Sequence, residues 1–253
     1  MAKANGWNVV GMITNDIIGS SRADNGRIDV KHVRLFAEGV PAVREMPGDL
    51  RTRVQTGGEN DSGARELARF IKATAEKQAP GMTVNIVYRR DRYLRGGDHA
   101  PFLDAGYAAV RMTEPNEDFR HQHQDLRTEG NVKCGDLPEF CDFNYIAEVA
   151  RVNAAALGAL ALAPATPQDV KVETKELTND TTLVWRANTE PDIAGYRIVW
   201  RETTAADWQQ STSAGNVTRF TVPEVSKDNY LFGVCAVDND GNVSPVVYPA
   251  PFR

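Results

Sequence analysis

The sequence predicts two domains of different class: a three-layer α/β domain over residues 1–164 and an all-β sandwich over residues 167–253. In the first part, apolar strand-like runs alternate with amphipathic helix-like runs, which is typical of a mostly parallel sheet covered by helices. The composition then changes sharply at Pro164-Ala165-Thr166-Pro167. Beyond that point short runs alternate at period two between turn residues, which predicts a sandwich.

The α/β part begins with an apolar run at 9–13, which predicts a buried strand that places Asn15 and Asp16 at its end. Leu67, Phe70 and Ile71 are spaced three and four apart, so we expect an amphipathic helix over 62–77. Ser62 or Asp61 can cap this helix, and for Asp61 we expect no role beyond the cap. Further strands are expected at 32–37, 83–88 and 108–112, and further helices at 98–105 and 137–162.

The second part contains runs with alternating apolar residues at 170–174, 181–185, 196–200, 220–222 and 230–237. This segment resembles a fibronectin type III domain. The features that carry the resemblance are Trp185 as a core residue, the Gly195-Tyr196 strand start, the Tyr230 corner and the ending from Ala236 to Ser244. The resemblance implies a spacer or a surface-binding module, and it implies no catalytic chemistry.

Composition excludes several classes of protein. The formal net charge of −5 argues against a nucleic-acid partner, because binding phosphates requires a basic surface. The most apolar piece, 154–163, is too short for a membrane span. The first residues do not have the pattern of a signal peptide. Cys134 and Cys141 are close enough in sequence to pair, and the alternative is that all three cysteines are reduced.

The residues that carry chemistry concentrate between 92 and 127. Three of the four histidines, His99, His121 and His123, lie there, and we expect no role for His32. Imidazole and carboxylate groups packed this closely are typical of a metal site or of acid–base chemistry. The carboxylates among them are Asp98, Asp104, Glu114, Glu117, Asp118 and Asp125.

The order of these motifs resembles the zinc aminopeptidase family, which includes leucyl aminopeptidases, glutaminyl cyclases and the transferrin receptor ectodomain. The resemblance covers residues 7–164. The motifs are Asn15-Asp16-Ile17-Ile18-Gly19, then Gly-Gly-Asp-His-Ala-Pro-Phe at 96–102, then an apolar strand, Thr113-Glu114 and a histidine.

The resemblance implies two zinc ions bridged by an aspartate and substrates that are peptides with a free N-terminus. Asp16 would be a ligand of one ion, and a late histidine a ligand of the other. Asp125 lies four residues after His121, the usual family spacing, whereas Phe119 and Gln122 favour His123. We favour His123 and keep His121 as the alternative. Asp98 and His99 would lie behind the ligands or bind substrate.

The chain also departs from the family pattern. A His-x-Asp motif, the bridging Asp and a Glu-Glu pair normally precede the segment that matches Asp16, and the first Glu of that pair is the general base. The 15 residues before Asp16 contain no His, Asp or Glu. The α/β domain therefore looks N-terminally incomplete, and each ion keeps one of the three or four ligands that it needs. We expect no catalytic residue and no hydrolysis by this chain alone.

Two other functions remain open from the sequence. One is a non-catalytic binding or interaction module, and the other is a glutaminyl-cyclase-like transferase, because Asp98-His99-Ala100-Pro101-Phe102 fits that branch too. An incomplete sheet would leave an apolar face open, which either a homo-oligomer or the chain's own loops would have to cover. The resemblance also implies a secreted or periplasmic protein.

Overall fold

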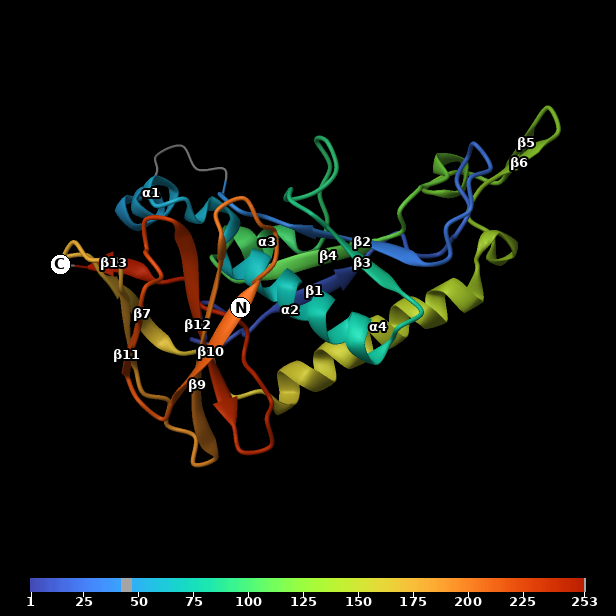
Figure 1. Cartoon of the computed structure of the whole chain (residues 1–253). Coiled ribbons are helices and arrows are strands. Elements are labelled where there is room, and N and C mark those ends of the chain that lie inside the picture. The colour runs from blue at the N-terminus through green and yellow to red at the C-terminus, as the bar shows by residue number, and fades with distance from the viewer. Residues whose placement is uncertain (42–46, 253) are drawn as a thin grey trace. The chain divides into compact units, whose positions relative to one another are not determined.

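The computed structural model describes residues 1–41 and 47–252 (Figure 1). The chain forms two compact units. Unit 1 contains Met1–Glu38 and Ile71–Leu157, and unit 2 contains Gly39–Phe70 and Gly158–Arg253. The segment Gly39–Phe70 is therefore grouped with the C-terminal strands, whereas the sequence analysis assigned it to the α/β domain. The helix α2 (Gly63–Gln78) begins in unit 2 and ends in unit 1.

A four-stranded sheet with the order β1-β4-β2-β3 forms the centre of unit 1. Its strands are β1 (Met12–Asn15), β2 (His32–Ala37), β3 (Thr83–Val87) and β4 (Ala109–Thr113). The last three lie within one residue of their predicted positions. β1 instead begins three residues after the start of the buried strand predicted at 9–13, and Val10 is 59% exposed. β1 pairs with β4 and β2 with β3 in parallel, while β2 and β4 are antiparallel. Because β1 and β4 are parallel neighbours, their carboxyl ends meet at one edge, where Asn15 pairs with Met112.

The long helix α4 (Phe143–Leu162) starts later than the predicted residue 137. Pro138–Phe140 instead forms a short 3-10 turn, and the Asp142 carboxylate accepts hydrogen bonds from the backbone N–H groups of Asn144 and Tyr145. This side chain satisfies the free amides of the first turn and fixes the start of the helix. The buried face contains Tyr145, Val149, Val152 and Ala156, whereas Leu157 is exposed.

By length and composition α4 is apolar enough to cross a membrane, with a mean hydropathy of 1.3 in its most apolar window. The sequence analysis found no apolar run of that length. A core helix of a soluble protein meets the same criterion, so this helix alone assigns no membrane location. The remaining elements of unit 1 are α3 (Ala100–Asp104), the 3-10 turn η2 (Phe119–His121) and a hairpin of β5 (Arg127–Glu129) and β6 (Val132–Cys134).

Seven strands of unit 2 form two sheets with the orders β10-β9-β12 and β11-β8-β7-β13. A shared core contains Leu183 and Trp185 from one sheet and Tyr196, Ile198 and Phe232 from the other, with the Trp185 and Tyr196 rings 5.1 Å apart. The strands are β7 (Gln168–Glu173), β8 (Thr181–Arg186), β9 (Ile193–Glu202), β10 (Gln210–Gly215), β11 (Arg219–Val222), β12 (Tyr230–Asp238) and β13 (Ala250–Phe252).

The segment Gly39–Phe70 contains α1 (Gly48–Gln55), the 3-10 turn η1 (Gly58–Asn60) and the first residues of α2. The prediction that Asp61 caps α2 is wrong. Ser62 Oγ accepts the hydrogen bond from Arg65 N, while both Asp61 oxygens accept from Arg201 Nη2 at 2.7 and 2.9 Å. Two buried guanidiniums, those of Arg201 and Arg69, face the Asp61 carboxylate and hold it away from the helix end.

Candidate functional site

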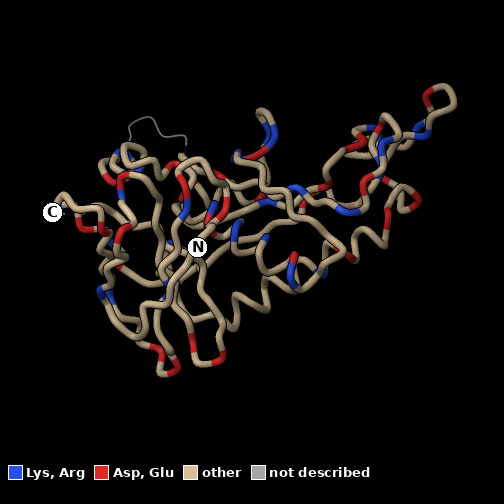
Figure 2. The backbone as a smooth tube through the Cα atoms, in the orientation of Figure 1, with Lys and Arg blue, Asp and Glu red and all other residues tan. Residues whose placement is uncertain are grey.

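A cavity of about 580 Å³ in unit 1 brings together the three predicted metal ligands, Asp16, His121 and His123. It lies beyond the carboxyl ends of β1 and β4, where functional residues of such sheets gather. Charged residues of both signs alternate along the segment that follows β4 (Figure 2). The other lining residues are Ile17, Gly19, Ser20, Glu114, Asp118, Gln122, Asp136, Leu137, Pro138, Phe140, Cys141 and Phe143.

The backbone around Asp16 is held firmly at this edge. The Asp16 N–H donates to Met112 O at 3.0 Å. The next residue, Ile17, has a φ of 59°, which is strained for a β-branched residue. Its carbonyl oxygen accepts hydrogen bonds from Glu114 N at 2.7 Å and Thr113 Oγ1 at 2.9 Å, and these bonds hold the strained turn. Strain fixed in this way is common at functional sites.

A fully buried arginine on β4 contacts Asp16 from the protein side. Arg111 Nη2 lies 2.8 Å from Asp16 Oδ2, and Nη1 lies 3.0 Å from Asp91 Oδ2. Nη1 also donates to Gly96 O at 2.8 Å. Burial by itself would raise the pKa of Asp91, but hydrogen bonds from Arg92 and Arg111 hold that pKa below its usual value. Asp91 is therefore the charged partner that keeps Arg111 in the interior.

Both candidate histidines line the cavity, so the structure leaves the choice between them open. The His121 ring stacks on Phe140 with centroids 3.6 Å apart, and His121 Nε2 lies 3.5 Å from Asp118 Oδ2. His123 is exposed and has a φ of 53°. Hydrogen bonds from Arg120 lower the pKa of Asp118, so this carboxylate is negative at neutral pH.

Glu114 also lines the cavity, and the sequence analysis placed it in a motif without assigning it a role. Its carboxylate accepts a hydrogen bond from Ser20 N at 2.8 Å, and burial raises its pKa to about 7. A carboxyl group with a pKa near neutral can both accept and donate a proton under physiological conditions. The available signal was the position of Glu114 directly after the apolar strand that ends beside Asp16.

Asp98 and His99 do not line the cavity. Asp98 is exposed, whereas His99 is buried, with Nε2 2.8 Å from Arg90 O and 3.7 Å from Asp91 Oδ2. Asp91 and Arg111 therefore connect His99 to Asp16. Neither Asp91 nor Arg111 was predicted as a site residue, although an arginine inside an apolar strand run is an unusual feature that could have indicated one.

The donor chemistry of the cavity suits zinc, because zinc in proteins binds imidazole nitrogen and carboxylate oxygen. Yet among residues 1–41 and 47–252 no three His, Cys, Asp or Glu side chains converge closely enough to hold a metal ion. Cys134, Cys141 and Cys235 are free thiols, so the pairing of Cys134 with Cys141 is not formed. The described side chains therefore supply the right kinds of ligand without the full number.

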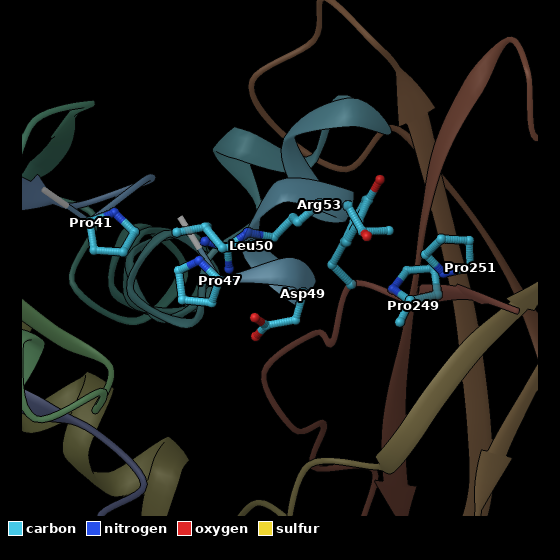
Figure 3. A pocket seen from close by; sticks show the side chains of 10 residues that line it. Pro41, Pro47, Asp49, Leu50, Arg53, Pro249 and Pro251 are labelled. Carbon is cyan, nitrogen blue, oxygen red and sulfur yellow. The ribbon is translucent and has the colours of Figure 1, made fainter. Parts of the chain in front are cut away.

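A second cavity, of about 520 Å³, lies in unit 2 between α1 and residues 248–251, which include the start of β13 (Figure 3). Four prolines line it together with Leu50, Tyr248 and Ala250. Asp49 and Arg53 are its only charged lining residues in the part of the chain that the structure describes. Among the described residues, this lining includes no histidine, cysteine or paired carboxylates.

Proteins of known sequence support a relationship to zinc metallopeptidases, although no family model matches this chain. A probable zinc metalloprotease of Leptosphaeria maculans is 50% identical over 98% of this chain and 57% of its own length. The corresponding values are 49%, 96% and 50% for a relative from Pyrenophora teres and 50%, 96% and 49% for one from Pyricularia oryzae. The chain thus spans about half the length of the curated relatives it matches.

The solved structures to which this chain is similar cover about a third of it. A Fn3-like protein from Clostridium thermocellum is 22% identical over 36% of this chain and 96% of its own, with a TM-score of 0.28. A titin module from human cardiac muscle is 25% identical over 34% of this chain and 84% of its own, with a TM-score of 0.27. Scores this low carry no argument about the fold.

Proposed function

We propose that this chain carries part of the metal and substrate site of a zinc-dependent peptidase of the aminopeptidase type. The observation that carries the proposal is the cavity in which Asp16, His121 and His123 meet beside the strained turn at Ile17. The names of the relatives support the metal and the hydrolysis of peptides. The aminopeptidase type rests on the motif resemblance, which also supports an exported protein.

The cavity residues suit a peptide with a free N-terminus. Asp16, Asp118 and Asp136 place carboxylates along the wall, and these attract an ammonium group. Ile17, Leu137 and Phe140 form an apolar part of the wall that can pack against a side chain and exclude water. The chemistry that zinc supplies in such sites is polarisation of a carbonyl and activation of water. Asp16 and His123, or His121 in its place, would bind the metal.

Glu114 is the group best suited to hold a proton in this cavity, because its pKa of about 7 matches the working pH of a general base. Its carboxylate is fixed by Ser20 N. We nevertheless propose that this chain alone does not hydrolyse peptides, because the described residues offer fewer convergent ligands than a zinc site requires.

The proposal is tested by zinc titration and by hydrolysis of leucine p-nitroanilide, with Asp16→Ala, His121→Ala and His123→Ala as variants. We expect weak zinc binding that Asp16→Ala and one histidine variant reduce further, and no turnover. His32→Ala is the matched control, since His32 pairs with Asp29 and lies outside the cavity. Zinc binding that is indifferent to all three cavity variants would contradict the proposal, and rapid turnover would contradict the predicted inactivity.

The second candidate is a non-catalytic binding module, which the shortage of convergent ligands favours. It predicts that a peptide with a free N-terminus binds the cavity without zinc and is not cleaved. A glutaminyl-cyclase-like activity would instead convert a peptide with an N-terminal glutamine and leave the leucine substrate intact. For the two-sheet part of unit 2 we propose a fibronectin type III domain, supported by the Trp185–Tyr196 core.

A further inference from the structure

Asp16 has two chemically different sides. Its Oδ2 atom contacts Arg111 Nη2 at 2.8 Å, and a Cβ atom placed on Gly97 would lie 3.4 Å from the same Oδ2. Among the described residues, no hydrogen bond or ion pair involves Oδ1, and the Asp16 side chain is 40% exposed where it lines the cavity. One carboxylate oxygen therefore faces the protein and the other is available to the cavity.

Arg111 is too firmly anchored to move away from this contact. Its side chain is 0% exposed, and Nη1 is held by Asp91 Oδ2 at 3.0 Å and by Gly96 O at 2.8 Å. Nη2 forms no aligned hydrogen bond within the described chain, so the contact to Asp16 acts through charge at close range. Asp91 is also contacted by Arg92 Nε at 3.2 Å, whereas among the described residues the ion pair of Asp16 is the one with Arg111, so the Asp16 carboxylate depends on Arg111 for its contact with the protein.

We propose that Arg111 is a positioning residue, which fixes Oδ2 of Asp16 so that Oδ1 points into the cavity as a ligand for a cation. The inference rests on the proposed function, which makes Asp16 a zinc ligand. Partners behind a ligand set its orientation, and losing one typically lowers metal affinity by about tenfold to a hundredfold. Asp91 has a supporting role, because it compensates the charge of Arg111.

The Gly-Gly segment before Asp98 fits this arrangement. A Cβ atom on Gly97 would lie 2.9 Å from Arg111 Nη1 and 3.3 Å from His99 Nδ1, so any larger residue would displace the guanidinium or the imidazole. The backbone at Gly97 can pass close to Arg111 only without a side chain. The motif that the sequence analysis linked to Asp98 and His99 thus also shapes the space around Arg111.

The test is a zinc titration combined with a direct measurement of the Asp16 side chain. The variant is Asp91→Asn/Arg111→Met, because methionine keeps much of the length of arginine and asparagine leaves no buried charge unpaired. Asp16→Asn and the triple variant complete the cycle. Arg90→Met is the matched control, since Arg90 pairs with Glu38 and Asp104 in the same unit and does not contact Asp16. Three-bond NMR couplings report the rotamer of Asp16 without added metal.

We expect the Asp91→Asn/Arg111→Met variant to bind zinc about tenfold to a hundredfold more weakly, while the triple variant binds no more weakly than Asp16→Asn alone. The Asp16 couplings should report one rotamer in the parent chain and an average in the variant. The inference would be overturned if Asp91→Asn/Arg111→Met bound zinc as tightly as the parent chain or more tightly. It would also be overturned if these two substitutions lowered zinc affinity equally in the parent chain and in Asp16→Asn, or if the Asp16 rotamer did not change. If the parent chain binds no zinc through Asp16, the proposed function fails, and the rotamer measurement alone decides the role of Arg111.

Discussion

Replacing Arg201 by methionine should destabilise unit 2 strongly, because this arginine forms the buried ion pair that ties the segment Gly39–Phe70 to the two sheets. The side chains of Arg201 and Asp61 are 1% and 0% exposed, and the two ion-pair distances are 2.7 and 2.9 Å. Trp208 packs beside Arg201, and its Nε1 donates to Glu66 Oε2 at 3.0 Å. The pair is therefore part of a charged cluster that water does not reach.

The magnitude follows from what each substitution leaves behind. Removing one partner of a buried ion pair costs about 3–5 kcal/mol, since the other charge remains desolvated. After Arg201→Met, Asp61 still has Arg69 Nη1 at 3.2 Å, so we expect a loss near the lower end, about 3 kcal/mol. After Asp61→Asn, Arg201 keeps the carbonyl oxygen of Ala205 at 2.5 Å but loses its carboxylate partner, so we expect about 4 kcal/mol.

The assay is urea unfolding followed by tryptophan fluorescence, since Trp185, Trp200 and Trp208 all belong to unit 2. The control is Arg219→Met, which removes an exposed arginine. Arg219 pairs with Glu173 on the four-stranded sheet of unit 2, and its loss should leave the urea midpoint unchanged. If Arg201→Met and Asp61→Asn shift the midpoint no more than this control does, the cluster is not a stabilising link, and the reasoning fails.

Three further predictions concern single groups. Burial raises the folded-state pKa of Glu114 to about 7 from 4.5, so its contribution to stability is complete below pH 4.5 and lost as pH rises through 7. The free energy of unfolding of the parent chain should therefore fall between pH 5 and pH 8, and this fall should exceed that of Glu114→Gln by on the order of 3 kcal/mol. An equal fall in the two proteins would contradict this prediction. Tyr145→Phe leaves His32 O without the 2.9 Å hydrogen bond from the Tyr145 hydroxyl, so the free energy of unfolding measured in urea should fall by about 1–2 kcal/mol. An unchanged free energy of unfolding would show that water replaces the bond. Cys141 is exposed while Cys134 and Cys235 are buried, and burial raises the pKa of the Cys235 thiol to about 12. One thiol should therefore react quickly with iodoacetamide in the native chain. Mass spectrometry should place the label on Cys141.

Local patterns predicted most of the strands. The runs that became β2, β3 and β4 carry their signal within five or six residues, because side chains alternate or stay apolar over that distance. The apolar run at 9–13 overlaps β1 only at Met12 and Ile13. The start of α4 was missed, since the apolar pattern continues back to Leu137 while the cap at Asp142 depends on one side-chain geometry. The antiparallel pairing of β2 with β4 could not be predicted either, because the order of strands in a sheet depends on contacts between distant segments.

The site was predictable to the extent that its residues follow recognisable motifs. Asp16 and the two histidines could be named as candidate ligands because each lies in a short pattern, and all three line one cavity. Arg111 and Asp91 lie 20 residues apart and belong to no motif, so their pairing could not be inferred from spacing. Asp61 was misjudged for the same reason, because Asp-Ser-Gly before a helix predicts a cap and its partner Arg201 lies 140 residues later.

The two buried arginines, Arg111 and Arg201, show how structure separates a stabilising ion pair from a functional one. Each lies on a strand and is almost wholly inaccessible, but Arg201 pairs with Asp61 whereas Arg111 contacts both Asp16 and Asp91. Asp61 is 0% exposed, so both of its oxygens are used within the protein and its charge can serve only stability. The Asp16 side chain is 40% exposed and lines a cavity together with two histidines. Arg111 contacts its Oδ2 atom, and we infer that its Oδ1 atom is available to a ligand. An aspartate held in this way suits the binding of a cation, and for that reason Arg111 is the arginine that we connect with function.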